Sequence, residues 1–291
     1  MSRKPTDEKK PFSAVLFDLD GTLTNTLEDI ADAMNRALRL HGLPEWETED
    51  YKRLVGNGAR VLARRAVRER EEMTEPVLRD YQAWYETHNQ VKTRPYDGIP
   101  ELLRALTARG IPVCVLSNKP HEDTLHVLGH FFPEISFAVA LGQTERFPLK
   151  PDPAGALWIA EQLGIAPADF AYLGDTGVDM TCARAAGMQP VGVLWGFRDR
   201  QELLDNGAGR LIARPEELLL EEESTPGERV YDENGRLVGF AKESIFGGRV
   251  YYDTEGRQAG YSVGALLGGE RFFDKNGTPK GYSVDSVLKG N

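Results

Sequence analysis

The sequence has few of the features that mark secreted, membrane or nucleic-acid-binding proteins. Its 291 residues contain two cysteines, Cys114 and Cys182, which are too few for a disulfide framework and lack metal-site spacing. No apolar run approaches the ~20 residues that a membrane-spanning helix needs, and the polar stretch from Met1 to Lys10 is unlike a secretory signal. The net charge of −10 argues against a nucleic-acid partner, which would need a basic face. We therefore expect a cytoplasmic protein with neither nucleic-acid nor membrane partners.

The most informative segment is a short apolar run, residues 14–17, followed by Asp18 and Asp20. The run predicts a buried strand. Residues two apart on a strand point to the same side, so the two carboxylates would lie together. Because like charges repel and burial makes each charge costlier, such a pair suits a bound cation or a catalytic proton. Gly21 permits a sharp turn and Thr22 offers hydrogen-bond donors beside it. Taken alone, the pair could also be an acidic strand end that caps a helix.

From residue 95 onward, strand and helix patterns alternate. The predicted strands cover residues 111–116, 137–141, 170–173 and 190–194, and the predicted helices cover 99–109, 123–128, 154–164 and 183–186. This alternation is typical of an α/β fold with a parallel sheet between helices. Ligands in such folds bind at the carboxyl ends of strands. Asp18, Ser117 and Asp175 all follow predicted strands, so we expect them to converge.

Between the first strand and this alternating region, the pattern is helical. Helices are predicted over residues 27–41, 60–70 and 74–89, the first of them with Thr26 as its N-cap. A tight turn, Gly56-Asn57-Gly58, separates the first two. By itself this turn favours a simple helix–helix connection; the alternative is a loop of backbone donors at the tip of a lid.

Four short motifs together resemble the haloacid dehalogenase superfamily, in its phosphatase branch, and most closely its phosphoglycolate phosphatases. The resemblance covers roughly residues 12–220. It implies a Rossmann-like parallel-sheet core (11–25 and 93–222) with an inserted α-helical cap (26–92). In chain order the motifs are Asp18-Leu19-Asp20-Gly21-Thr22, Ser117-Asn118, Lys150 in Lys150-Pro151-Asp152-Pro153, and Gly174-Asp175-Thr176-Gly177-Val178-Asp179.

The resemblance also implies a reaction, the Mg²⁺-dependent hydrolysis of a small phosphorylated metabolite through an aspartyl-phosphate. Asp18 would be the nucleophile, and Asp20 the acid that protonates the leaving oxygen and then the base that activates water. Mg²⁺ would bind Asp18, the backbone carbonyl of Asp20, and Asp175, an oxygen-only set that suits this ion.

Further site residues follow from the same resemblance. Ser117, Asn118 and Lys150 would bind the phosphate. The supporting residues would be Thr22, Thr176 and Asp179, of which Asp179 would orient Lys150 or a metal-bound water. The cap loop that reaches into the active site would be Gly56, Asn57 and Gly58.

Other reactions of the superfamily are partly separated by particular residues. The second aspartate, Asp20, disfavours dehalogenases, which lack it. A phosphomutase or a phosphonatase stays open as an alternative; a phosphonatase would need a Schiff-base lysine in the cap, where Lys52 is the only lysine between Asn25 and Lys92. Asn25 and Thr26 stand where an acidic residue and serine are common, which leaves cap closure and substrate choice open.

The C-terminal part, residues 227–291, repeats with a 21-residue period. Asp232, Asp253 and Asp274 correspond, and glycines and aromatic residues recur in the same register. Such a period indicates one unit used three times, and the Asp-x-x-Gly segments predict hairpin turns. We expect three β-hairpin repeats after the acidic linker 220–226. They would either contact a partner or a second copy of the chain, or pack as a structural appendage; a binding module dominated by these repeats is the weakest functional alternative.

Overall fold

The computed structural model describes residues 12–219, 228–231, 237–243, 249–252, 258–264, 270–275 and 278–283. The chain divides into two compact units, residues 1–215 and 216–291, which are described separately. Within the described residues, no helix combines the length and the apolar character that crossing a membrane requires.

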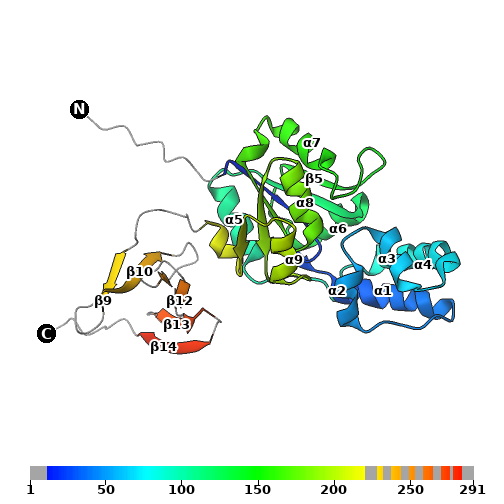
Figure 1. Cartoon of the computed structure of the whole chain (residues 1–291), viewed down its shortest axis with the longest axis horizontal. Coiled ribbons are helices and arrows are strands. Elements are labelled where there is room, and N and C mark those ends of the chain that lie inside the picture. The colour runs from blue at the N-terminus through cyan, green and yellow to red at the C-terminus, as the bar shows by residue number, and fades with distance from the viewer. Residues whose placement is uncertain are drawn as a thin grey trace. The chain divides into compact units, whose positions relative to one another are not determined.

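The first unit is built on a six-stranded parallel sheet with the strand order β5-β4-β1-β6-β7-β8 (Figure 1). β1 lies centrally and pairs on both sides, Val15 with Val113 of β4 and with Ala171 of β6. Its four residues are buried, as expected for an apolar strand in a parallel sheet. The predicted parallel α/β sheet is confirmed. The strands are β1 Ala14–Phe17, β4 Val113–Pro120, β5 Val139–Gln143, β6 Phe170–Gly174, β7 Gln189–Val193 and β8 Arg210–Ile212.

Helices follow the strands and cover the sheet. Leu16 of β1 and Tyr172 of β6 pack against Ile159 of α7 and Ala183 of α8 in one apolar cluster. Glycines with positive φ lie beside two of the helix ends, Gly98 before α5 and Gly164 after α7. The helices of this part are α5 Ile99–Ala108, α6 His121–Phe131, α7 Ala154–Leu163, α8 Gly177–Ala185 and α9 Arg200–Asp205.

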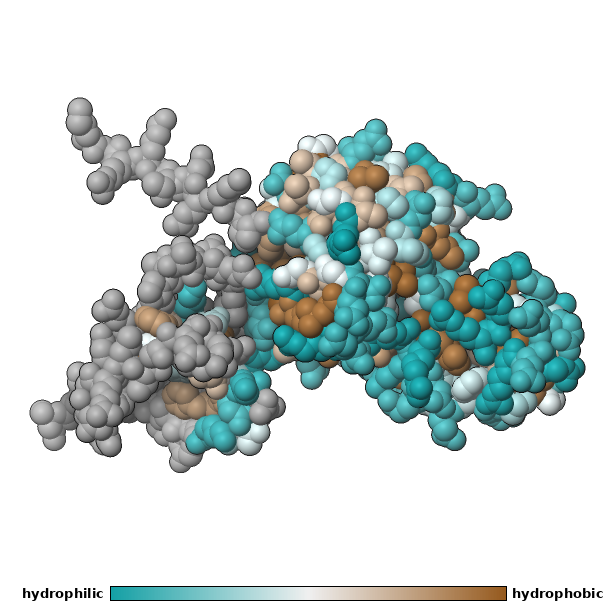
Figure 2. All heavy atoms as spheres, in the orientation of Figure 1, coloured by the Kyte–Doolittle hydropathy of each residue, from teal (hydrophilic) through white to brown (hydrophobic). Residues whose placement is uncertain are grey.

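A helical insertion, residues 27–88, separates β1 from the other strands of this sheet along the chain. It has its own apolar core, in which Met34, Tyr51 and Tyr81 are buried, and its surface in Figure 2 is mostly hydrophilic. Short strands β2 Thr24–Asn25 and β3 Arg94–Pro95 pair where the chain enters and leaves it. The helices are α1 Leu27–Leu40, α2 Tyr51–Leu54, α3 Ala59–Ala66 and α4 Thr74–His88, with short turns at Thr48–Asp50 and Glu71–Met73.

Asp29 of α1 connects the segment that enters the insertion to the segment that leaves it. Its buried carboxylate accepts hydrogen bonds from the backbone N–H groups of Lys92 (2.9 Å) and Thr93 (2.9 Å) and from the Thr93 hydroxyl (2.8 Å). Because these donors lie just before β3, Asp29 fixes the return segment against the start of α1.

Several boundaries differ from the sequence prediction. α3 ends at Ala66 rather than at residue 70, because Arg68 has a positive φ of 56° that a helix cannot accommodate. Sequence patterns also missed α9, β8 and the β2–β3 pair, which are short and carry little periodicity.

The second unit is a six-stranded antiparallel sheet in which strands follow one another in chain order, β9 to β14. The expected all-β character is confirmed. The Tyr261 and Phe273 rings of neighbouring strands stack at 4.9 Å between centroids. The first two predicted hairpin turns and the linker 220–226 lie outside the described residues. The strands are β9 Glu228–Tyr231, β10 Leu237–Glu243, β11 Arg249–Tyr252, β12 Gln258–Gly264, β13 Glu270–Asp274 and β14 Pro279–Ser283.

Candidate active site

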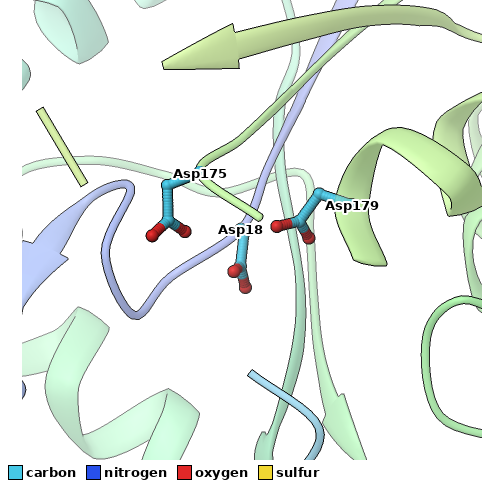
Figure 3. Close-up of side chains that lie close together, drawn as sticks. All are labelled: Asp18, Asp175 and Asp179. Atoms are coloured by element: carbon cyan, nitrogen blue, oxygen red, sulfur yellow. The ribbon is translucent and has the colours of Figure 1, made fainter. Parts of the chain in front are cut away.

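Three carboxylates meet at the carboxyl ends of the central strands. Asp18 follows β1, Asp175 follows β6, and Asp179 lies in the first turn of α8 (Figure 3). One oxygen of each lies within 4.8 Å of the others, and all three residues are buried. The structure therefore brings together acidic residues that are more than 150 positions apart in the sequence.

Asp18 is held by contacts to one of its oxygens. Oδ1 accepts a hydrogen bond from the backbone N–H of Leu19 at 2.7 Å and lies 2.7 Å from the Lys150 ammonium. Burial raises the pKa of Asp18 well above its usual range, and Asp179 raises it further, while Lys150 acts in the opposite direction. Because both of these contacts are made by Oδ1, Oδ2 is the oxygen left available to a ligand.

Asp175 is positioned from two sides. Its Oδ1 accepts from the Thr22 hydroxyl at 3.3 Å, and its Oδ2 accepts from the backbone N–H of Phe197 at 2.7 Å. Burial, followed by the charge of Asp179, raises the pKa of Asp175 to about 7. Gly21 has a φ of 88°, and a Cβ there would lie 2.3 Å from Asp175 Oδ2. The turn after β1 therefore requires glycine for both conformation and space.

Lys150 connects the nucleophile candidate to α8. Its ammonium donates to Asp179 Oδ1 at 2.7 Å and to the Leu116 carbonyl at 3.0 Å, in addition to its contact with Asp18. Asp179 Oδ2 accepts from the hydroxyl (2.6 Å) and the backbone N–H (3.1 Å) of Thr176, which closes a capping box at the start of α8. Asp179 thus holds Lys150, the first of the two roles expected for it.

The acidic cluster has the chemistry of a divalent cation site. The Lys150 ammonium contacts Asp18 and Asp179, so the cluster holds three carboxylates and one ammonium. Carboxylate oxygens are the donors that Mg²⁺ binds in proteins. The residues present therefore fit the ion that the sequence implied.

Asp20 faces a second lysine. Lys119 donates to both of its carboxylate oxygens, at 2.9 and 3.2 Å, and to the Tyr85 hydroxyl of α4 at 2.6 Å. Burial lowers the pKa of Lys119, but the charge of Asp20 and other acidic neighbours outweighs this and raises it. Two lysine–carboxylate pairs therefore lie side by side in the same site, Lys150 with Asp18 and Lys119 with Asp20.

A small pocket of about 60 Å³ opens onto these groups. At roughly 10–15 Å³ per water, it holds only a few water molecules. Asp18, Asp20 and Ser117 line it from the sheet side, and the insertion contributes mostly apolar or aromatic side chains, Ile30, Val55, Ala59, Leu62, Tyr81 and Tyr85.

Not every expected site residue faces the pocket in the expected way. Gly56 and Gly58 line it, but the side-chain Oδ1 of Asn57 instead accepts from the Arg65 guanidinium at 2.9 Å. Asn118 lines the pocket, yet its side chain is engaged by backbone: it accepts from the Lys150 N–H (2.8 Å) and donates to the Gly56 carbonyl (3.1 Å). Asn118 thus positions Lys150 and the insertion loop through its side chain.

Residues 15–193 match the family model of the haloacid dehalogenase-like hydrolases. The chain belongs to this family. It is 30% identical over 213 residues to phosphoglycolate phosphatase 1 of Pseudomonas aeruginosa, covering 70% of this chain and 78% of that protein. It is 34% identical over 213 residues to the N-acetylmuramic acid 6-phosphate phosphatase of the same organism, covering 71% and 92%.

Solved structures of this hydrolase family have the same fold as the first unit. A candidate phosphoglycolate phosphatase from Lactobacillus delbrueckii subsp. bulgaricus superposes with a TM-score of 0.69 at 29% identity, covering 73% of this chain and all of the other. A hydrolase from Pseudomonas syringae gives 0.60 at 27% identity, covering 72% and 97%.

Sequence reasoning missed several residues of this hydrolase site. Lys119 directly follows the Ser117-Asn118 motif, so its place in the sequence was a usable signal. Phe197 and Arg198 lie in an irregular segment after β7; the Arg198 guanidinium donates to the Val55 carbonyl of the insertion at 2.9 Å. No residue pattern marks that segment as part of the site.

Proposed function

We propose that this hydrolase is a Mg²⁺-dependent phosphatase of a small phosphorylated metabolite, with phosphoglycolate as the leading substrate. The observation that carries the proposal is the arrangement of Asp18 and Asp20 in one small pocket, each paired with its own buried lysine, beside an acidic cluster that fits a divalent cation. The names of the two relatives described above support a phosphatase.

In the first step, Asp18 Oδ2 attacks phosphorus and the bond from phosphorus to the ester oxygen breaks. Asp20 gives its proton to that leaving oxygen. The products of this step are the free alcohol and an aspartyl-phosphate on Asp18. Lys150 stays beside Asp18 and stabilises the negative charge of the phosphoryl oxygens, together with Ser117.

In the second step, Asp20 takes a proton from water as the water oxygen bonds to phosphorus. The bond between phosphorus and Asp18 breaks, which restores the Asp18 carboxylate and releases inorganic phosphate. The proton that Asp20 gave away in the first step is thereby returned, so both residues end as they began.

The Mg²⁺ would be held by Asp18, Asp175 and the backbone carbonyl of Asp20. Asp179 would position Lys150 by accepting its hydrogen bond. When bound, the ion supplies positive charge that lets the phosphate dianion approach an ionised aspartate. Thr22 and the Phe197 N–H keep Asp175 directed into the cluster. The insertion acts as the cap: it closes the pocket and keeps water away from the aspartyl-phosphate.

The pocket favours a small substrate over a sugar phosphate. The cap side is dominated by apolar and aromatic groups, which offer few partners for sugar hydroxyls. Phosphoglycolate has only a carboxymethyl group beyond its phosphate. We therefore rank it ahead of N-acetylmuramic acid 6-phosphate, although both are phosphate esters of a carboxylic acid.

The phosphonatase alternative finds no support at its required lysine. The ammonium of Lys52 lies 2.7 Å from Glu49, its side chain is 37% exposed, and it is absent from the lining of the pocket. A Schiff-base lysine would need to enter the site. The phosphomutase alternative would retain the same nucleophile and differs in the fate of the phosphoryl group.

A hydrolysis screen with Mg²⁺ tests the proposal. The panel contains phosphoglycolate, N-acetylmuramic acid 6-phosphate, a glucose phosphate and a phosphonate, with phosphate release as the readout. We expect the highest kcat/KM for phosphoglycolate. Conversion of the glucose phosphate to an isomer without net phosphate release would favour the mutase, and no phosphate release from any ester would contradict the proposal.

A further inference from the structure

Two lysine side chains line the pocket, but the proposed mechanism gives a role to only one of them, Lys150. Among the described residues that line it, Lys119 and Lys150 are the cationic ones. Lys150 lies against the nucleophile and Asp179. Lys119 is as deeply buried, with 3% of its side chain exposed, and lies against the acid/base instead.

The Lys119 ammonium is anchored beside the acid/base. It donates to both oxygens of Asp20, at 2.9 and 3.2 Å, and to the Tyr85 hydroxyl at 2.6 Å. Lys119 therefore places a buried positive charge in the pocket lining, where it can bind an anion of a ligand.

The substrate's own shape supplies that anion at the right place. In phosphoglycolate, the carboxylate is attached to the carbon that bears the leaving oxygen. Asp20 must reach this oxygen, and Lys119 is a direct neighbour of Asp20. A substrate carboxylate so close to the leaving oxygen therefore enters the same small space as the Lys119 ammonium.

Tyr85 completes the receptor for a carboxylate. Its hydroxyl oxygen accepts from Lys119 at 2.6 Å, so its own hydrogen is available to a further acceptor. Burial raises the pKa of Tyr85 well above its usual value, so this hydrogen is retained. Tyr85 belongs to α4 of the insertion, and the ammonium it contacts belongs to β4. A ligand bound by both would tie the cap to the sheet.

We propose that Lys119, with Tyr85, is the receptor for a carboxylate next to the phosphoester carbon. This rests on the proposed phosphatase function and assigns the feature that selects its substrate. Phosphate esters without this carboxylate offer no anion to the Lys119 ammonium and are poor substrates for that reason.

The test compares phosphoglycolate with hydroxyethyl phosphate, in which a neutral alcohol replaces the carboxylate. We expect wild type to prefer phosphoglycolate at least about 100-fold in kcat/KM, and Lys119→Met to reduce this preference at least tenfold, because an unmatched buried polar partner discriminates strongly. Lys52→Met, the loss of an exposed ammonium in the cap, serves as the matched control and should leave both rates unchanged. An equal loss on both substrates in Lys119→Met would overturn the receptor assignment.

A binding measurement avoids any Lys119 variant. Asp20→Asn removes the charge with which Asp20 competes against a ligand for the Lys119 ammonium, whereas Asp18→Asn leaves the Lys119–Asp20 pair intact. Both variants should be inactive, so ligand binding can be measured by calorimetry with Mg²⁺. We expect the preference for binding phosphoglycolate over hydroxyethyl phosphate to be at least threefold greater in Asp20→Asn, since charge-assisted hydrogen bonds are about twice as strong as neutral ones. Equal preferences would contradict the receptor assignment.

The outcomes separate the inference from the proposed function. A wild type that hydrolyses both esters equally well is a phosphatase in which Lys119 does not recognise a carboxylate. A wild type that releases phosphate from no ester of the panel contradicts the phosphatase, and the binding comparison then decides alone whether Lys119 receives a carboxylate.

Discussion

Asp179→Asn isolates the residue that holds Lys150. The substitution keeps the size of the side chain but removes the charge that accepts from Lys150 at 2.7 Å, and it directs an amide donor or a neutral oxygen at that ammonium. Removing one partner of a buried ion pair costs roughly 3–5 kcal/mol. Lys150 retains Asp18 at 2.7 Å and the Leu116 carbonyl at 3.0 Å, and loss of the Asp179 charge relieves its repulsion of Asp18 and Asp175. The lower end of the range, about 3 kcal/mol, therefore applies.

The expected change in melting temperature follows from that figure. The first unit covers residues 1–215. For domains of this size, 1 kcal/mol corresponds to roughly 2–4 °C, so the melting temperature should fall by roughly 6–12 °C. With Lys150 no longer fixed from α8, kcat should also fall about 100-fold, as when one charge-stabilising donor is misplaced.

The assay is thermal unfolding followed by circular dichroism, with kcat measured well below the transition. Asp152→Asn is the matched control, because Asp152 is an exposed aspartate two residues after Lys150. Its side chain accepts from the Ala154 N–H at 2.8 Å, a role that asparagine retains. If Asp179→Asn unfolds at the wild-type temperature and turns over at the wild-type rate, Lys150 is not held from α8 as described.

Three further predictions concern the hinge, the metal and the C-terminal repeats. Asp29→Ala should lower the free energy of unfolding, measured by chemical denaturation, by about 2–4 kcal/mol, because it leaves three hydrogen-bond donors of Lys92 and Thr93 without their acceptor. The control Asp32→Ala loses only an exposed ion pair and should lower it by under about 1 kcal/mol. Chelation should abolish turnover and Mg²⁺ should restore it, while Mg²⁺ at 100 times its Kd should add about 2.7 kcal/mol to stability; turnover that is insensitive to chelator would remove the metal from the account. A chain cut after Glu223 should fold and hydrolyse an aryl phosphate at close to the full-length rate, with light scattering reporting any change in association; loss of turnover in a folded truncated chain would place the repeats in the active site.

The sequence predicted the parts of the site that depend on strand ends. The short apolar run before Asp18 requires burial and forms β1, which ends at Phe17, so Asp18 and Asp20 lie in the turn after the strand; both line the pocket. The alternating pattern requires a parallel sheet, which places Ser117, inside β4, and Asp175, after β6, on the two sides of β1. These inferences need only local periodicity and the rule that parallel strands share an edge.

The remaining features depend on tertiary contacts that one sequence does not display. The position of Lys119 after the Ser117-Asn118 motif indicates that it lies near the site, but it does not identify its partners, because Asp20 and Tyr85 lie 99 and 34 positions away. Asn57 looks like a loop-tip donor, yet Arg65 from the following helix takes its side chain. The extent of α3 depended on the positive φ of Arg68, a conformation that sequence patterns do not predict for arginine.

The nucleophile assignment is tested most directly by trapping the covalent intermediate in Asp20→Asn with p-nitrophenyl phosphate. This ester has a good leaving group, so its first step needs little help from an acid, whereas the second step still lacks its base. The account predicts a burst of about one nitrophenolate per chain, followed by slow turnover. It also predicts a hydroxylamine-sensitive phosphoryl group on Asp18, absent from the Asp18→Asn/Asp20→Asn double variant. A burst with the label on another residue, or turnover in the double variant equal to that of Asp20→Asn, would contradict it.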